Sequence, residues 1–167
     1  MLLIGNGSVI TRNPSQPYLQ EGCVTVRENK IVEVGTSKEL RGKYPDASFL
    51  DAQGRVIMPG LINTHMHCYS SFARGMDLKA QSPHEFNEIL ERLWWRLDKT
   101  LTMEDVYYSA AVAMIDCIKN GATTIFDHHA SPNCVTGSLF RMSEAAAELG
   151  IRTCLCYEVS DRDGAQV

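Results

Sequence analysis

The stretch "MPGLINTHMHCYSSFARG", which runs from Met58 to Gly75, decides the fold of this chain. An apolar segment that opens with a Pro-Gly pair leads into two histidines, His65 and His67, with one residue between them. Residues two apart on an extended strand point to the same side. We therefore expect both imidazoles to project together from the carboxyl end of a strand, where they can hold a divalent metal ion. Two histidines packed for structure alone are the alternative for so short a motif.

The composition is typical of a globular protein of one domain, or of one domain with a small companion. The chain has 167 residues, of which 44% are hydrophobic and 22% are charged, and its net charge is −4. No basic run indicates a nucleic-acid partner. No apolar stretch is long enough for a membrane span or a signal peptide, so we expect a cytoplasmic protein with reduced cysteines. Cys154 and Cys156 are expected to be buried as small hydrophobic residues.

Residues 1–57 are predicted to form short strands. The segment "CVTVRENKIVEVG" is typical of a hairpin that turns at Glu28-Asn29, between two β-branched runs. The segment "SFLDAQGRVIMPG" is predicted to repeat this pattern, with Gln53-Gly54 as its turn. This part of the sequence therefore indicates a small β-rich domain.

From residue 58 onward, strands and helices alternate. Strands are predicted at 56–64, 123–128 and 151–158. Helices are predicted to begin at Ser82, with a capping box to Glu85, at Thr102, and at Ser138. Gly121 and Gly150 are placed to end the last two helices. Strands separated by helices imply right-handed crossovers and a parallel sheet, and thus an α/β fold.

The segment from Pro59 to His67 resembles the first barrel strand of the amidohydrolase superfamily. That strand has the form Pro-Gly-apolar-apolar-Asn/Asp-x-His-x-His, and Asn63 in place of aspartate is familiar from the deaminase and chlorohydrolase branch. Four further segments, "SSFARGM", "LWWRLDKTLT", "GATTIFDHHASP" and "DRDG", resemble the SsnA-type aminohydrolases. The resemblance covers nearly the whole chain.

This resemblance implies the N-terminal portion of a (β/α)₈ TIM-like barrel, preceded by strands of a small β-sandwich. Residues 1–57 would be the sandwich portion, and residues 58–167 would be the first three βα units of a truncated barrel. A complete barrel takes about 250 residues. We therefore expect the chain to be the N-terminal part of a longer protein.

The resemblance also implies a metal-dependent aminohydrolase or deaminase, which acts on a non-peptide C–N bond of a small heterocycle or amidine. One divalent ion, zinc or iron, would be held by His65 and His67 and would activate a water molecule. The remaining ligands and the catalytic acid and base residues come from later strands, beyond Val167, so the chain alone is expected to be inactive. A small-molecule substrate and a homo-oligomer are expected. The alternatives are a chlorohydrolase or cyclic-amide hydrolase on the same fold, and a non-catalytic assembly module.

Three further residues are candidates for substrate binding. His128 and His129 follow Asp127 at the end of the second predicted barrel strand, which is the end where barrel enzymes carry their active sites. A substrate or second-metal role and a structural hydrogen-bond network are equally compatible with that position. Arg74 lies in the loop after the first barrel strand and could bind a substrate carboxylate through two hydrogen bonds. A solvated or salt-bridged arginine is the alternative.

Overall fold

The computed structural model describes residues 1–77, 79, 81–162 and 164. The chain divides into two compact units, Met1–Pro59 and Gly60–Val167, and each is described by itself. Strands and helices both contribute, which confirms the α/β class. Within the described ranges, no helix is both long enough and apolar enough to cross a bilayer.

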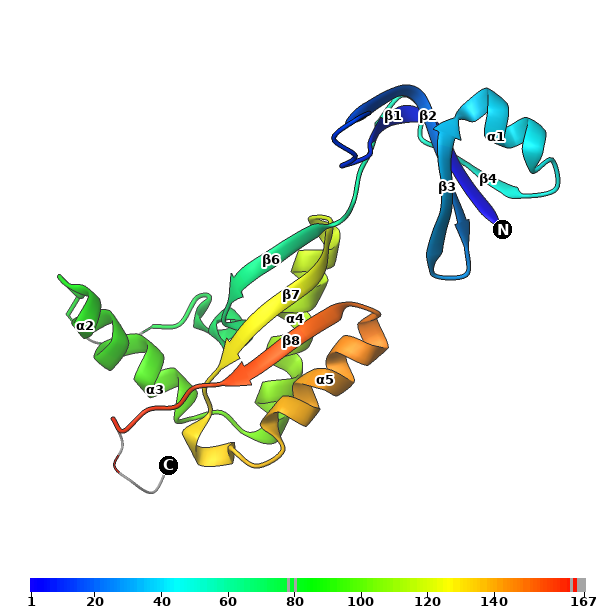
Figure 1. The fold of residues 1–167 in the computed structure, drawn as a ribbon. Coiled ribbons are helices and arrows are strands. Elements are labelled where there is room, and N and C mark those ends of the chain that lie inside the picture. The colour runs from blue at the N-terminus through cyan, green and yellow to red at the C-terminus, as the bar shows by residue number, and fades with distance from the viewer. Residues whose placement is uncertain (78, 80, 163, 165–167) are drawn as a thin grey trace. The chain divides into compact units, whose positions relative to one another are not determined.

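The first unit is a five-stranded sheet with one short helix (Figure 1). Its elements are β1 (Leu2–Ile10), β2 (Tyr18–Arg27), β3 (Lys30–Thr36), α1 (Ser37–Lys43), β4 (Ser48–Asp51) and β5 (Val56–Ile57). The strand order is β3-β2-β1-β4, and β5 also pairs with β1. A small core of Leu3, Cys23 and Leu40 lies between the sheet and α1.

One predicted hairpin of this unit is confirmed and the other is wrong. β2 and β3 are antiparallel, and Glu28 in the turn between them has a φ of 54°. The turn at Gln53-Gly54 also exists, with φ angles of 52° and 77°. However, β4 and β5 do not pair with each other. Each instead runs parallel to a successive segment of β1, because the turn moves the chain along that strand and does not fold it back.

The sequence analysis missed the helix α1. Thr36 caps it with a capping box: its side chain accepts a hydrogen bond from the backbone N–H of Glu39, and the Glu39 carboxylate accepts one from the backbone N–H of Thr36. This Thr-x-x-Glu spacing is a helix-start signal that can be read from the sequence. The helix has only seven residues, which is too short to show a clear apolar period.

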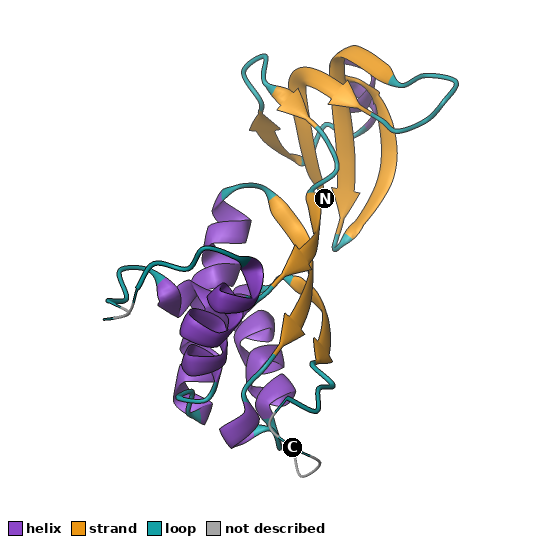
Figure 2. Cartoon of the chain, turned by 90° about the vertical axis from the view of Figure 1, so that its left-hand side faces the viewer, coloured by secondary structure: helices purple, strands orange, loops and turns teal. Residues whose placement is uncertain are grey.

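The second unit is a three-stranded parallel sheet with its helices on one face (Figure 2). Its strands are β6 (Leu61–Met66), β7 (Ala122–His129) and β8 (Arg152–Tyr157), in the order β6-β7-β8. Its helices are α2 (Phe86–Ile89), which continues through a π-helical turn (Leu90–Trp94) into α3 (Trp95–Asp98), then α4 (Met103–Lys119) and α5 (Ser138–Leu149). Short 3₁₀ segments occupy Cys68–Ala73 and Pro132–Cys134.

The first strand of this unit begins later than predicted. Val56 and Ile57 form β5 of the first unit, and β6 starts only at Leu61. Gly60 stands at the point where the chain enters β6 beside β7. A Cβ atom at Gly60 would lie 2.2 Å from the side chain of Thr123, so only glycine fits this close approach.

Two of the three predicted helix starts are correct. Thr102 caps α4 through a capping box with Asp105, and α5 begins at Ser138. The predicted start at Ser82 is wrong, because α2 begins at Phe86 with Glu85 at its N-cap position. The carboxylate of Glu88 accepts the backbone N–H of His84 instead, so the residues after Ser82 stay outside the helix.

The core of the second unit lies between the sheet and its helices. Its fully buried members come from α4, α5 and β7, and include Val106, Ala110, Met114, Met142, Ala145 and Ile125. On the opposite face of the sheet, Phe126 is 43% exposed. Cys154 and Cys156 are exposed as well, so the expectation that these thiols are buried is wrong. Their alternation with Thr153 and Leu155 on β8 places them on the face without helices.

Candidate metal centre

The two histidines of the opening motif meet at the end of β6. His65 lies in the strand, and His67 stands directly before the 3₁₀ segment that follows it. Their Nε2 atoms are 3.2 Å apart. The expectation that both imidazoles project to the same side is therefore confirmed, and their ring planes stand at 81° to each other.

The orientation of His67 is set by the neighbouring strand. Its Nδ1 atom lies 2.9 Å from the backbone carbonyl oxygen of His128. A carbonyl oxygen only accepts hydrogen bonds, so Nδ1 carries the proton and Nε2 presents its lone pair. Metal-ligating histidines are typically held in this way, with the other ring nitrogen bound to a carbonyl or carboxylate.

The spacing of the two rings fits a pair of ligands to one ion. Zinc is bound by histidine nitrogens at about 2.0–2.1 Å, so two such nitrogens at a tetrahedral ion lie about 3.3 Å apart. The separation between His65 and His67 matches this value. Across the described residues, no group of three or more histidine, cysteine, aspartate or glutamate side chains converges. The pair would therefore provide two of the ligands of such an ion.

Asp127 supports the turn that follows His67. Its carboxylate accepts a hydrogen bond from the backbone N–H of Cys68, and its side chain is buried on the helix-covered side of β7. Burial raises the pKa of Asp127 above its ordinary value, and the hydrogen bonds from Cys68 oppose that shift. The structure thus gives Asp127 a backbone-holding position beside the histidine pair.

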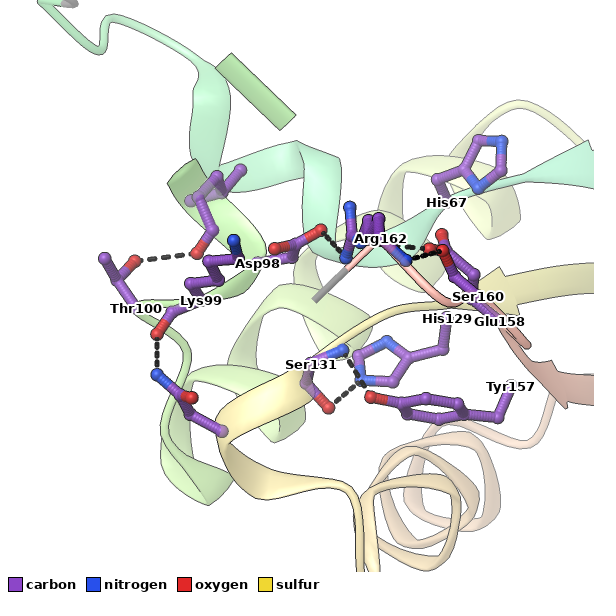
Figure 3. Close-up of polar contacts among 12 residues, drawn as sticks. His67, Asp98, Lys99, Thr100, His129, Ser131, Tyr157, Glu158, Ser160 and Arg162 are labelled. Carbon is purple, nitrogen blue, oxygen red and sulfur yellow. Dashed lines mark hydrogen bonds and ion pairs between the residues drawn. The ribbon is translucent and has the colours of Figure 1, made fainter. Parts of the chain in front are cut away.

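The two candidate histidines of β7 face opposite ways. The ring of His128 lies 5.5 Å from that of His67, on the side of the histidine pair. His129 is fully buried on the other side, between the rings of Tyr69 and Tyr157. Its Nε2 atom lies 2.9 Å from the hydroxyl oxygen of Ser131 (Figure 3). Burial lowers the pKa of His129 to about 4. A substrate role for either histidine stays a prediction, and only His128 lies beside the pair.

Arg74 shares a groove with the histidine pair. An open groove of about 940 Å³ runs along β6, and its lining includes His65, His67, Arg74 and Asp116. The guanidinium of Arg74 is paired with the carboxylate of Asp116 on α4, at 2.7 Å. The structure therefore shows the salt-bridged alternative, and substrate binding by Arg74 stays a prediction.

Tyr69 was not singled out in the sequence analysis. It is buried, and its ring lies 6.3 Å from that of His67 and 5.9 Å from that of His129. The Tyr69 ring therefore lies between His67 of the histidine pair and the buried His129. Its place in "HCYSS", two residues after the second histidine, carries no pattern that distinguishes it from an ordinary core tyrosine.

The Amidohydrolase family matches residues 56–166, which hold both histidines and all three strands of the parallel sheet. This chain belongs to the amidohydrolase family. The resemblance inferred from the opening motif is thus confirmed.

Curated relatives of this amidohydrolase chain are named as deaminases. The 5'-deoxyadenosine deaminase of Methanosarcina mazei is 33% identical over 126 residues, which are 75% of this chain and 27% of that protein. The 5-methylthioadenosine/S-adenosylhomocysteine deaminase of Desulforudis audaxviator is 32% identical over 157 residues, which are 93% of this chain and 33% of that protein. The chain thus spans about a third of the length of the curated relatives it matches.

Solved structures share the fold of this amidohydrolase chain. The atrazine chlorohydrolase TrzN from Arthrobacter aurescens, crystallised with zinc, matches with a TM-score of 0.73 and 26% identity, over 94% of this chain and 35% of that one. The guanine deaminase of E. coli matches with a TM-score of 0.78 and 20% identity, over 99% of this chain and 39% of that one. At 20% identity, the match to the guanine deaminase supports a shared fold only.

Proposed function

We propose that this chain provides the first two metal ligands of a metal-dependent aminohydrolase, which releases ammonia from an aminated purine or a related heterocycle. The observation that carries the proposal is the His65 and His67 pair, with Nε2 atoms 3.2 Å apart at the carboxyl end of a parallel strand. The deaminase names of the relatives favour an adenine nucleoside as the substrate class. The (β/α)₈ barrel, the sandwich portion and the SsnA subgroup are part of this proposal.

The residues of the chain have distinct duties in this reaction. His65 and His67 would hold the ion through their Nε2 atoms, and the carbonyl of His128 keeps His67 in the tautomer that leaves Nε2 free. Asp127 holds the backbone turn that begins at Cys68. A divalent ion bound here would lower the pKa of a water molecule toward about 7, which supplies a nucleophile at neutral pH. The proton transfer to the leaving ammonia is assigned to none of the described residues.

The metal part of this proposal is tested by zinc titration, followed through the imidazole ¹H–¹⁵N NMR signals. We expect weak zinc binding that shifts the signals of His65 and His67, and we expect His65→Ala or His67→Ala to weaken it by about 100-fold or more. His84→Ala is the matched control, because His84 is exposed and does not line the groove at the histidine pair. Zinc that leaves the two imidazole signals unmoved would contradict the metal site.

The reaction is tested by ammonia release from 5'-deoxyadenosine, guanine and cytosine, with zinc or ferrous iron added. The Methanosarcina mazei deaminase serves as the positive control. We expect no turnover by the chain alone, because general acid–base help is worth about 10²–10⁴-fold and an incomplete ligand set costs more. Turnover comparable to that of the control would show that the catalytic residues lie within the chain.

A chlorohydrolase is the second candidate, and the match to zinc-bound TrzN at 26% identity favours it. Both reactions use an activated water molecule on an sp² carbon, and they differ in the leaving group. Chloride release from a chlorotriazine by the chain supplied with zinc, without ammonia release from 5'-deoxyadenosine, would favour this candidate over the deaminase.

A further inference from the structure

Arg162, which follows β8, binds a helix that lies far away in the sequence. Its Nη2 atom is 2.6 Å from the carboxylate of Asp98 at the end of α3, and its Nε atom is 3.3 Å from the carboxylate of Glu158 (Figure 3). Its guanidinium also lies over the ring of Trp95, at 5.3 Å. One side chain thus connects the loop after the third strand to the helical segment 86–98, which precedes α4.

This connection is buried. The side chain of Asp98 is fully shielded from solvent, and that of Arg162 is only 12% exposed. Removing one partner of a buried ion pair leaves a charge uncompensated and is strongly destabilising. Glu158 is fixed in turn, because its backbone N–H donates to the carbonyl of His129 at 2.8 Å. The contact is therefore specific in geometry and is anchored at both of its ends.

The same helical segment is connected to the histidine pair through contacts of two aromatic rings. Trp94 precedes Trp95, and its ring lies 6.4 Å from that of Tyr69, which in turn lies 6.3 Å from that of His67. The pKa of Tyr69 is raised to about 12, first by burial and then by the negative charges of Asp98 and Glu158. A displacement of the helical segment would therefore be passed to His67 by direct packing.

We propose that Arg162 is a positioning residue, whose ion pair with Asp98 fixes the helical segment 86–98 against Tyr69 and thereby holds His67 in its metal-binding orientation. This inference rests on the proposed function, because it assigns a metal to His67. It adds Arg162 as a residue that supports the orientation of His67 from outside β6 and β7. Residues that orient metal ligands in this way typically change metal affinity by about 10- to 100-fold when they are replaced.

The experiment is the zinc titration described above, carried out on variants of the whole chain. Arg162→Met is expected to weaken zinc binding about tenfold and to replace the single Nδ1–H tautomer signal of His67 with a mixture of tautomers. Arg162→Lys keeps the charge and should recover part of the affinity. Asp98→Asn keeps the shape of the buried partner, so it gives a second measurement that does not depend on the folding of Arg162→Met.

Arg141→Met is the matched control. Arg141 also pairs with a carboxylate, that of Glu144, and also lies over an aromatic ring, that of Tyr107, but it lies on α5. We expect its zinc affinity to stay within about twofold of the parent chain.

The outcomes separate this inference from the proposed function. Zinc binding and a His67 tautomer signal that are unchanged in Arg162→Met and Asp98→Asn, while His67→Ala loses zinc binding, would overturn the positioning role and leave the metal site standing. A His67→Ala variant that binds zinc as well as the parent chain would overturn the proposed function itself. The tautomer signal would then still show whether Arg162 orients the ring.

Discussion

The two faces of the parallel sheet place neighbouring residues of one strand in opposite environments. On β7, Ile125, Asp127 and His129 are buried on one face, whereas Phe126 is 43% exposed on the other face and the ring of His128 stands beside that of His67. The buried His129 has its pKa lowered to about 4, while its neighbour supplies a carbonyl to a metal-ligand candidate. Asp127, His128 and His129 are adjacent in the sequence but have different environments, because successive side chains of a strand point to opposite faces.

The largest difference between the faces is expected in core packing. Ile125→Ala removes a fully buried side chain, and we expect it to lower the free energy of unfolding by about 2–5 kcal/mol. Phe126→Ala, one residue later, removes a larger but 43% exposed side chain, and we expect a loss below about 1.5 kcal/mol. Urea unfolding followed by circular dichroism measures both. Equal losses would mean that the open face is also packed in solution.

The second expected difference is the pH dependence of stability that the buried His129 causes. The unfolded chain takes up a proton at His129 near pH 6.5, whereas the folded chain does so only near pH 4. The unfolded state therefore binds more protons between these values, so His129 makes stability fall as the pH drops from 6.5 to 4, by up to about 3 kcal/mol. Urea midpoints across this range should show the fall.

His129→Gln removes this titration and should flatten that part of the pH profile. His84→Gln is the control, because His84 is exposed, and it should keep the slope of the parent chain. If the His129→Gln profile stays parallel to that of the parent chain, another group causes the pH dependence.

The two faces should also differ in thiol reactivity. Cys154 and Cys156 are exposed on the open face, whereas Cys68 is 1% exposed and its pKa is raised, first by burial and then by the charge of Asp127. Because the thiolate is the reactive form, we expect Cys68 to react at least about 100-fold more slowly with a disulfide reagent. Mass spectrometry after timed labelling assigns each site. Fast labelling of Cys68 would indicate that the turn after His67 opens readily.

The smallest expected effect lies at the start of the helix that covers the sheet. Thr102→Ala removes the side chain that accepts the backbone N–H of Asp105, and we expect it to cost about 1 kcal/mol of stability. Ser82→Ala changes the residue that the sequence also marked as a cap, although α2 begins only at Phe86. We expect a change below about 0.5 kcal/mol there. A larger loss of stability in Ser82→Ala than in Thr102→Ala would contradict the assignment of Thr102 as a helix cap.

Features that depend on neighbouring residues could be predicted from the sequence. The His65 and His67 pair needs only the two-residue period of a strand, and the start of α4 needs only Thr102 and Asp105. The second hairpin was wrongly predicted, since local turn residues do not reveal whether the next strand pairs with its predecessor or with β1.

The features that could not be predicted join distant parts of the chain. Arg162 and Asp98 are 64 residues apart, and no local period connects them. The division of "DHH" between the two faces follows from alternation. Which face carries the helices, however, depends on the crossovers and not on those three residues. The burial of His129 therefore had to be read from the structure.

The glycine of the opening motif acts at a distance on the histidines that follow it. Gly60 and His67 are seven residues apart, which is about 23 Å of extended strand. Because the Thr123 side chain leaves no room for a Cβ at Gly60, any other residue would push β6 away from β7 at its start. Because β6 and β7 stay paired from Leu61 to Met66, we expect this shift to lengthen the distance between His67 Nδ1 and the His128 carbonyl oxygen. We therefore expect the close approach at Gly60 to contribute to the strand pairing that brings the His67 ring to the His128 carbonyl.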